Sequence, residues 1–146
     1  MSHEVQKSCC CARPLASAAI GYAKSSPNVS IRMQQLTSTN DTFYFRGPVS
    51  IQYRLEVRNP TSQPVTLRSL RLESIGPGAY SIHSSSTPVK LQLGPNESRA
   101  ITISTWGRAR GGFMSANEPV TIQGTAYFNS PSGSFVKLFN ENIMQP

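Results

Sequence analysis

The chain has 146 residues, of which 38% are hydrophobic and only 14% are charged. A chain of this length can bury a core of its own without disulfides to hold it together. Its 11 prolines and 10 glycines are spread along the sequence. Short segments punctuated in this way are typical of all-β proteins, and they argue against a helical domain.

The charge is strongly positive. Fourteen Lys and Arg stand against seven acidic residues, a net charge of +7. Such a surplus favours contact with anionic partners such as nucleic acid, anionic lipid or acidic polysaccharide. The alternative is that it only keeps the protein soluble. Because the basic residues are dispersed and form no dense run, we expect no specific nucleic-acid partner.

The N-terminal region differs from the rest of the chain. We expect residues 1–27 to be a flexible tail or a degenerate leader, and residues 28–146 to form the folded domain. The three cysteines are consecutive, Cys9, Cys10 and Cys11. Their thiols diverge and lack a good fourth ligand, which argues against a zinc site. They are candidates for lipid attachment, and we expect no metal, no cofactor and no transmembrane helix, because no run of about 18 apolar residues exists.

From residue 28 onward, apolar and polar side chains alternate. Residues 29–33 show the pattern first, and a polar loop follows over residues 37–42. The clearest case runs from Val49 to Arg58, where every second residue is apolar. Strict alternation predicts a strand with one buried and one wet face. Further strands are expected at 65–72, with a bulge near Arg68 and Ser69, and at 91–93, 101–106, 120–128 and 135–139.

Turn sequences separate these segments. Gly47-Pro48, Asn59-Pro60, Gly76-Pro77-Gly78, Gly94-Pro95-Asn96 and the run from Ser130 to Gly133 all fall between apolar stretches. Proline and glycine favour turns and are disfavoured inside a central strand. The sequence therefore predicts an all-β fold, an antiparallel β-sandwich of seven or eight strands.

Candidate catalytic residues are few. His83 precedes Ser84, Ser85 and Ser86, and a histidine can activate a hydroxyl, which makes a hydrolase the least favoured alternative. However, this polar run has no strained turn to hold a nucleophile. The seven acids are widely spaced, and no pair suggests acid–base chemistry. We expect that the chain is not an enzyme.

Outward-facing arginines form the main candidate binding site. Arg54, Arg58, Arg68 and Arg71 are expected on two neighbouring strands of one hairpin, where several could share a face and bind an anion. The alternative is a solvated face on which Glu56 and Glu73 pair with them, and exposed pairs contribute only about 0–1 kcal/mol each.

Two further features bear on anion binding. The Gly107–Gly112 segment is expected to be a flexible basic loop, and its Arg108 and Arg110 could also meet an anion. Tyr53 falls on the apolar face, so no stacking platform for nucleic-acid bases is evident. Trp106 is expected in the core.

A family resemblance rests on two motifs. In the first, Val57-Arg58-Asn59-Pro60 ends the long alternating strand and is followed by a polar turn and a second strand. In the second, Leu93-Gly94-Pro95-Asn96-Glu97-Ser98 leads into the alternating Ile101 and Ile103. Together they resemble the late-embryogenesis-abundant type 2 family, also called the water-stress-and-hypersensitive-response (WHy) domain. The resemblance implies an immunoglobulin-like β-sandwich without catalytic residues and with a role in stress protection. In bacteria such domains often occur in envelope proteins.

These observations lead to one main functional expectation. We expect a non-enzymatic interaction or stress-protective domain, in the cell envelope or secreted rather than in the cytoplasm, whose partner is a protein or an anionic surface. The alternative is a polyanion-binding module that uses the arginine face.

Overall fold

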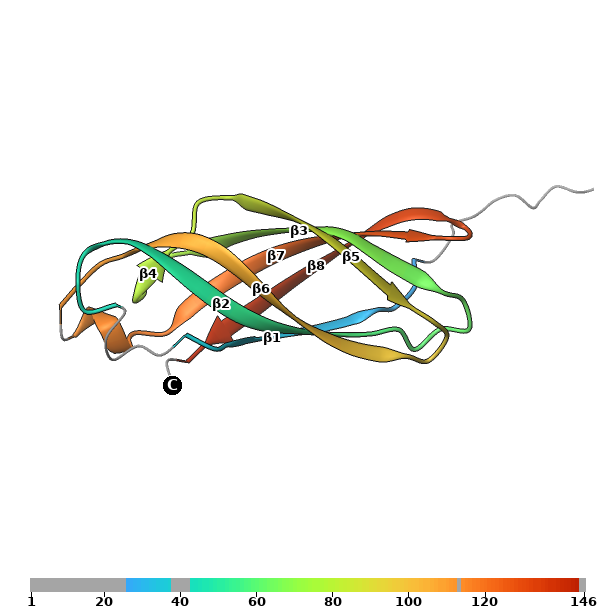
Figure 1. Ribbon diagram of the computed structural model, residues 1–146, viewed down its shortest axis with the longest axis horizontal. Coiled ribbons are helices and arrows are strands. Elements are labelled where there is room, and N and C mark those ends of the chain that lie inside the picture. The colour runs from blue at the N-terminus through green and yellow to red at the C-terminus, as the bar shows by residue number, and fades with distance from the viewer. Residues whose placement is uncertain (1–25, 38–42, 113, 145–146) are drawn as a thin grey trace, which may run out of the picture.

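The computed structural model consists of two layers of strands packed face to face (Figure 1). It describes residues 26–37, 43–112 and 114–144, so the expected tail and the cysteines Cys9, Cys10 and Cys11 lie outside the described residues. The strands are β1 (Ser30–Gln35), β2 (Gly47–Arg58), β3 (Val65–Ile75), β4 (Tyr80–Ser81), β5 (Ser85–Leu93), β6 (Ser98–Ala109), β7 (Val120–Ser130) and β8 (Gly133–Ile143), with one 3₁₀ turn, η2 (Ser115–Asn117).

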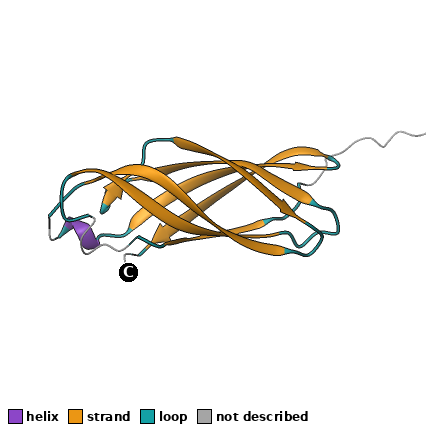
Figure 2. Cartoon of the chain, viewed as in Figure 1, coloured by secondary structure: helices purple, strands orange, loops and turns teal. Residues whose placement is uncertain are grey.

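Each layer is a four-stranded antiparallel sheet. Sheet A has the order β1-β2-β6-β4, and sheet B has the order β5-β3-β7-β8. Figure 2 shows that strands dominate the described chain. The fold is therefore an antiparallel, immunoglobulin-like β-sandwich, as the alternation predicted, although Gly47 and Pro48, expected in a turn, begin strand β2 and pair with β6. Of the helices that the structure describes, none is long and apolar enough to cross a bilayer.

The core lies between the two sheets and is built from the alternating positions. In β2 every second residue from Val49 to Val57 is buried, and the residues between them are exposed. Burial of one such aliphatic side chain contributes roughly 1.5–3 kcal/mol. The largest fully buried side chains are Tyr53, Tyr80, Phe43, Phe128, Ile51, Leu55, Leu67, Leu70, Leu72, Leu93, Ile122 and Val29.

The bulge expected in β3 is present. The register with β7 passes from Leu67 opposite Phe128 directly to Ser69 opposite Tyr127, so Arg68 is the extra residue of β3 in this pair. The bulge restores an inward direction to Leu70 and Leu72, which are both buried. It is the physical reason that the apolar residues of this strand change phase.

The Asn-Pro motif forms a corner between the two sheets. Asn59 is fully buried, and its side-chain amide donates to the carbonyls of Gln63 (2.7 Å) and Gly94 (3.0 Å). Its side-chain oxygen accepts from the backbone N–H and the hydroxyl of Thr61. Asn59 thus ties the β2–β3 loop to the β5–β6 turn and satisfies backbone groups that a buried loop would otherwise leave unpaired.

Candidate interaction surfaces

The four arginines expected on one face lie on opposite faces of the molecule. β2 belongs to sheet A and β3 to sheet B, so Arg54 and Arg58 point away from Arg68 and Arg71. The expectation of a shared hairpin face was wrong because the corner at Asn59 carries the chain across to the other sheet. Alternation identifies which residues point outward, but it does not say which strands pair.

On sheet A, a third arginine that we did not single out joins Arg54 and Arg58. In β1, Arg32 is exposed between the buried Ile31 and Met33 and lies opposite Glu56 in β2. A groove of about 550 Å³ runs along this edge and is lined by Arg32, Arg54, Glu56 and Glu141 among others. The short alternation around Arg32 could have identified it, because its position between two buried residues already directed it outward.

On sheet B, Arg68 and Arg71 have neutral partners. The Nε of Arg71 donates to the hydroxyl of Ser84 at 2.6 Å, and a guanidinium nitrogen of Arg68 lies 3.4 Å from the side-chain oxygen of Asn129. Both arginines are exposed. The neutral contacts leave their charges uncompensated, and this face remains basic.

The basic Gly107–Gly112 segment is not a free loop over its whole length. Strand β6 continues to Ala109, so Arg108 lies on a strand opposite Pro48. Arg110 forms an ion pair with Glu118 at 2.8 Å and also donates to the carbonyl of Gly78 at 3.3 Å. Of the two arginines, Arg110 is therefore largely neutralised and Arg108 is not paired with an acid in the described residues.

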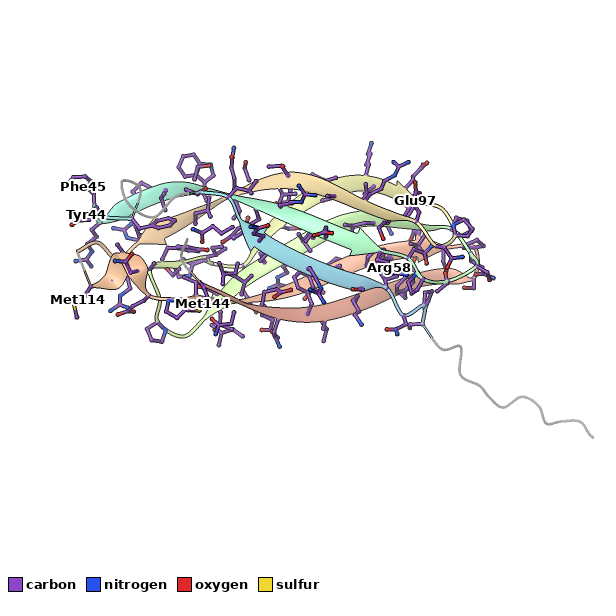
Figure 3. The ribbon with its side chains drawn as sticks, turned by 90° about the horizontal axis from the view of Figure 1, so that it is seen from below. Tyr44, Phe45, Arg58, Glu97, Met114 and Met144 are labelled. Atoms are coloured by element: carbon purple, nitrogen blue, oxygen red, sulfur yellow. The ribbon has the colours of Figure 1, made fainter. Side chains whose placement is uncertain are left out.

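Exposed apolar side chains gather on two adjoining loops at one end of the sandwich. Phe45 is 77% exposed and Met114 is 85% exposed, the two most exposed large apolar side chains that the structure describes. Figure 3 shows both at the same end of the molecule together with Tyr44. We call the surface formed by Tyr44, Phe45, Arg46 and Met114 the loop end.

The two loops of the loop end are held together through the backbone. The N–H of Gly112 donates to the carbonyl of Tyr44 at 2.9 Å. At Gly111, with φ of +81°, a Cβ would stand 2.8 Å from the backbone nitrogen of Arg46. A side chain is thus disfavoured at Gly111 both by the left-handed backbone and by this close approach. The two loops are therefore linked to each other at Tyr44 and Gly112 and at Arg46 and Gly111.

Trp106 is exposed and not part of the core, which corrects the expectation from sequence. It is 68% exposed on the outer face of sheet A, opposite Ser50. The inward positions of β6 are instead Ile103, Thr105 and Gly107. At Gly107 a Cβ would lie 2.9 Å from the Cδ1 of Ile51, so a neighbouring strand fills the space. Trp106 lies one outward position before Arg108, near the loop end.

The residues considered for catalysis do not come together in the described part of the chain. His83 is exposed in the segment between β4 and β5. Among the described residues, ion pairs join Arg99 to Glu97 and Arg110 to Glu118. The alternative reading, in which Glu56 and Glu73 pair with the arginines, is not observed there. The described residues also contain no cluster of three metal-ligating side chains.

Comparison with known proteins supports the fold and does not identify a family. No protein-family model matches the sequence, and no curated protein matches it. The X-ray structure of a structural-genomics target is similar at a TM-score of 0.56 with 13% identity, covering 86% of this chain and 91% of that chain. The putative ApaA protein from Bordetella pertussis is similar at a TM-score of 0.52 with 16% identity, over 83% of this chain and 94% of that chain.

A protein from Archaeoglobus fulgidus is similar at a TM-score of 0.51 with 10% identity, over 77% of this chain and 91% of that chain. At these identities the likeness is one of fold. The immunoglobulin-like all-β architecture is thus shared with known structures, whereas no family model supports the late-embryogenesis-abundant type 2 resemblance in particular.

Proposed function

We propose that the protein is a non-enzymatic binding domain whose loop end contacts an anionic surface, and that its partner is a membrane of the cell envelope. One observation carries the proposal: Phe45 and Met114 are exposed on adjoining loops at the same end of the molecule, and the exposed Arg46 follows Phe45 in the chain. Large apolar side chains rarely stand exposed together on a soluble domain without an interaction to serve. Apolar side chains flanked by cations match the boundary between lipid headgroups and acyl chains.

The charges and aromatic groups near the loop end support the same partner. Arg46 and Arg108 are exposed and lie at or beside this end. Near an anionic bilayer each such cation contributes about 1 kcal/mol. Trp106 lies on the adjoining outer face of sheet A, and tryptophan is favoured where an apolar region meets water. The overall charge of +7 acts in the same direction.

The non-enzymatic part of the proposal is supported by how the ionisable groups are used. The buried hydroxyls of Tyr53 and Tyr80 bond to each other and to Gln35 inside the core. His83 is exposed, and the grooves of the described surface are shallow and polar. This arrangement suits a rigid scaffold better than a reaction centre. The motifs at Asn59-Pro60 and at residues 93–98 favour a stress-protective role in the envelope, in line with the family resemblance.

Co-sedimentation with vesicles tests the proposal directly. We expect the full chain to bind vesicles of phosphatidylcholine and phosphatidylglycerol and to bind pure phosphatidylcholine weakly. Phe45→Ser combined with Met114→Ser should weaken binding at least about tenfold, because two apolar anchors are lost. Trp106 is the single tryptophan, and its fluorescence should shift to shorter wavelength on binding.

Two matched controls make this result specific. Val136→Ser removes an exposed apolar side chain from sheet B and should leave binding unchanged. Arg68→Gln with Arg71→Gln removes two charges from the far sheet and should weaken binding less than Arg46→Gln with Arg108→Gln. If anionic vesicles do not bind the chain, or if the control variants weaken binding as strongly as the loop-end variants, the proposal is wrong.

The outer face of sheet A supports a second candidate, binding of a soluble polyanion. Arg32, Arg54 and Arg58 line two adjacent grooves of this face, although Glu56 lies among them. Elution from a heparin column against salt tests this candidate, because contacts to anionic groups weaken steeply with salt. Arg54→Gln with Arg58→Gln should elute at clearly lower salt than Arg68→Gln with Arg71→Gln. Equal elution of the two variants would mean that only net charge matters.

A further inference from the structure

The open edges of the two sheets differ in how well they are protected against pairing with another chain. The edge strands are β1, β4, β5 and β8. β4 has two residues, β1 has six, and β5 contains Pro88, which cannot donate to a ladder. β8 has 11 residues and no proline. Within the described chain it pairs only with β7, so its other side offers backbone N–H and carbonyl groups.

The side chains of β8 also favour pairing. Val136 is 50% exposed and Leu138 is 63% exposed on the outer face, while Phe135 and Phe139 pack from the inner face against the core. Extended segments rich in aromatic and branched residues add readily to a sheet edge. The inner side of the edge also carries one cation, Lys137, and one anion, Glu141.

We propose that two copies of this chain associate through β8, antiparallel, to join the two B sheets into one eight-stranded sheet. The occupant of the edge is thus a second copy, because β8 is complementary to itself in one register. Centring the twofold axis on Phe139 places Lys137 of each copy opposite Glu141 of the other. Opposite charges at directly facing positions stabilise a strand pair, and like charges destabilise it.

Symmetry and charge select this register over its neighbours. In a symmetric antiparallel pair, one residue must lie directly opposite the same residue of the second copy. Shifting the register by one residue from such an arrangement would put the outer face of one copy on the inner side of the other. Centring on Lys137 or on Glu141 would place like charges face to face. Centring on Leu138 or on Asn140 would place a charged residue opposite Phe139. The register centred on Phe139 avoids both faults and forms two Lys–Glu pairs.

The same register removes apolar surface from water. Leu138 of each copy becomes the diagonal neighbour of Leu138 of the other across the axis, within reach of a long side chain. On the inner face Phe135 lies opposite Ile143 of the second copy. Because the long axes of the two copies run in opposite directions, the dimer presents two loop ends that point away from each other. This interface shares no residue with the loop end and does not depend on its function.

The alternative role for Lys137 and Glu141 is protective, since inward-pointing charges on an edge strand can also block pairing. Analytical ultracentrifugation of the full chain, with a reductant to prevent disulfides through Cys9–Cys11, separates the two roles. We expect wild type to form a concentration-dependent species of twice the 15.9 kDa monomer mass. A protective role predicts a monomer at every soluble concentration, which would overturn the proposal.

Charge reversal identifies the register. Lys137→Glu alone and Glu141→Lys alone should each raise the dimer dissociation constant at least about tenfold, because both attractive pairs become repulsive. The double variant should dimerise like wild type. An equimolar mixture of the two single variants should form a heterodimer, since every facing pair is then of opposite sign. If the single variants failed to dimerise because they misfolded, neither the double variant nor the mixture would regain dimerisation.

Matched charge reversals elsewhere complete the experiment. Lys90→Glu on the opposite edge strand and Glu73→Lys on β3 make the same changes in net charge and should leave dimerisation unchanged. Circular dichroism confirms that each variant keeps its strand content. A dimer that survives both single reversals at Lys137 and Glu141, or one that Lys90→Glu disrupts equally, uses a different surface and would also contradict the proposal.

Discussion

The hydroxyls of Tyr53 and Tyr80 lie 2.6 Å apart in the centre of the core. They come from sheet A strands β2 and β4, which are separated by β6. Tyr80 donates to the side-chain oxygen of Gln35 at 2.7 Å, so the remaining proton of the pair belongs to Tyr53, which donates to Tyr80. Gln35 in turn donates to the carbonyl of Thr37 at 2.7 Å. A chain of hydrogen bonds therefore gives the side chains of Tyr53, Tyr80 and Gln35 partners inside the core.

Replacing the two tyrosines should have unequal effects. Tyr80→Phe leaves the hydroxyl of Tyr53 without its acceptor and removes the hydrogen bond to Gln35, at a cost of about 1–3 kcal/mol of unfolding free energy. Tyr53→Phe removes only the terminal donor and should cost about 0.5–1.5 kcal/mol. Urea denaturation of both variants checks the order. If Tyr53→Phe is the more destabilising variant, the direction of the hydrogen-bond chain is wrong.

The same pair predicts a loss of stability in alkali. Burial raises the pKa of Tyr53, and burial also raises that of Tyr80, above the ordinary value of 10.0. The neutral hydroxyls thus stabilise the fold fully below pH 10, and this contribution falls as the pH rises further and the unfolded chain ionises. Unfolding free energy measured across this range should fall less steeply in the Tyr53→Phe and Tyr80→Phe double variant. Equal slopes would contradict the assignment.

Asn59 should be indispensable to the corner between the sheets. Asn59→Ala removes the donors to Gln63 and Gly94 and the acceptor for Thr61. We expect a loss of about 2–3 kcal/mol in unfolding free energy, since buried carbonyls lose their partners. Asn142→Ala, at an exposed position of β8, is the matched control and should change stability by less than about 0.5 kcal/mol. Comparable losses in the two variants would refute the structural role of Asn59.

Glu97 should make a contribution to the unfolding free energy that depends on pH in the acid range. The N–H of Gly94 donates to its carboxylate at 2.6 Å and Arg99 donates at 3.1 Å, and these bonds lower the pKa of Glu97 below the ordinary 4.5. Because the pKa is lower in the folded than in the unfolded chain, the ionised group stabilises the fold above pH 4.5. The contribution disappears as the pH falls through the folded pKa. Glu97→Gln should flatten the acid dependence of unfolding free energy, and an unchanged acid dependence in this variant would contradict the role of Glu97.

Gly124 should not tolerate a side chain, although its backbone is ordinary extended strand. It faces Phe139 across the β7–β8 pair, and a Cβ at this position would overlap the phenyl ring. Gly124→Ala should therefore cost about 1–3 kcal/mol of unfolding free energy. In a Phe139→Ala background the same change should cost much less, which a double-mutant cycle measures. Additive costs would show that the ring and Gly124 do not interact.

Part of the candidate site followed from local pattern and part did not. Exposed positions such as Arg54 and Arg71 were predicted, because alternation assigns each residue of a strand to a face. The common face expected for them was wrong, since strand pairing depends on where the Asn59 corner directs the chain. Trp106 was placed in the core because it is large and apolar. Trp106 alternates in step with the polar Thr102 and Ser104, and this pattern already places it on the outer face of the strand.

Sequence alone determined every strand except the two-residue β4, together with the bulge at Arg68 and the class of fold, because each depends on side-chain direction and turn chemistry within a few residues. Tertiary structure decided which strands became neighbours, which edges stayed open and which loops met at the loop end. Phe45 and Met114 are distant in sequence, and they lie at the same end of the molecule on loops joined by the bond from the N–H of Gly112 to the carbonyl of Tyr44. Contacts of this kind depend on closing long loops, and no short stretch of sequence contains the information to specify them.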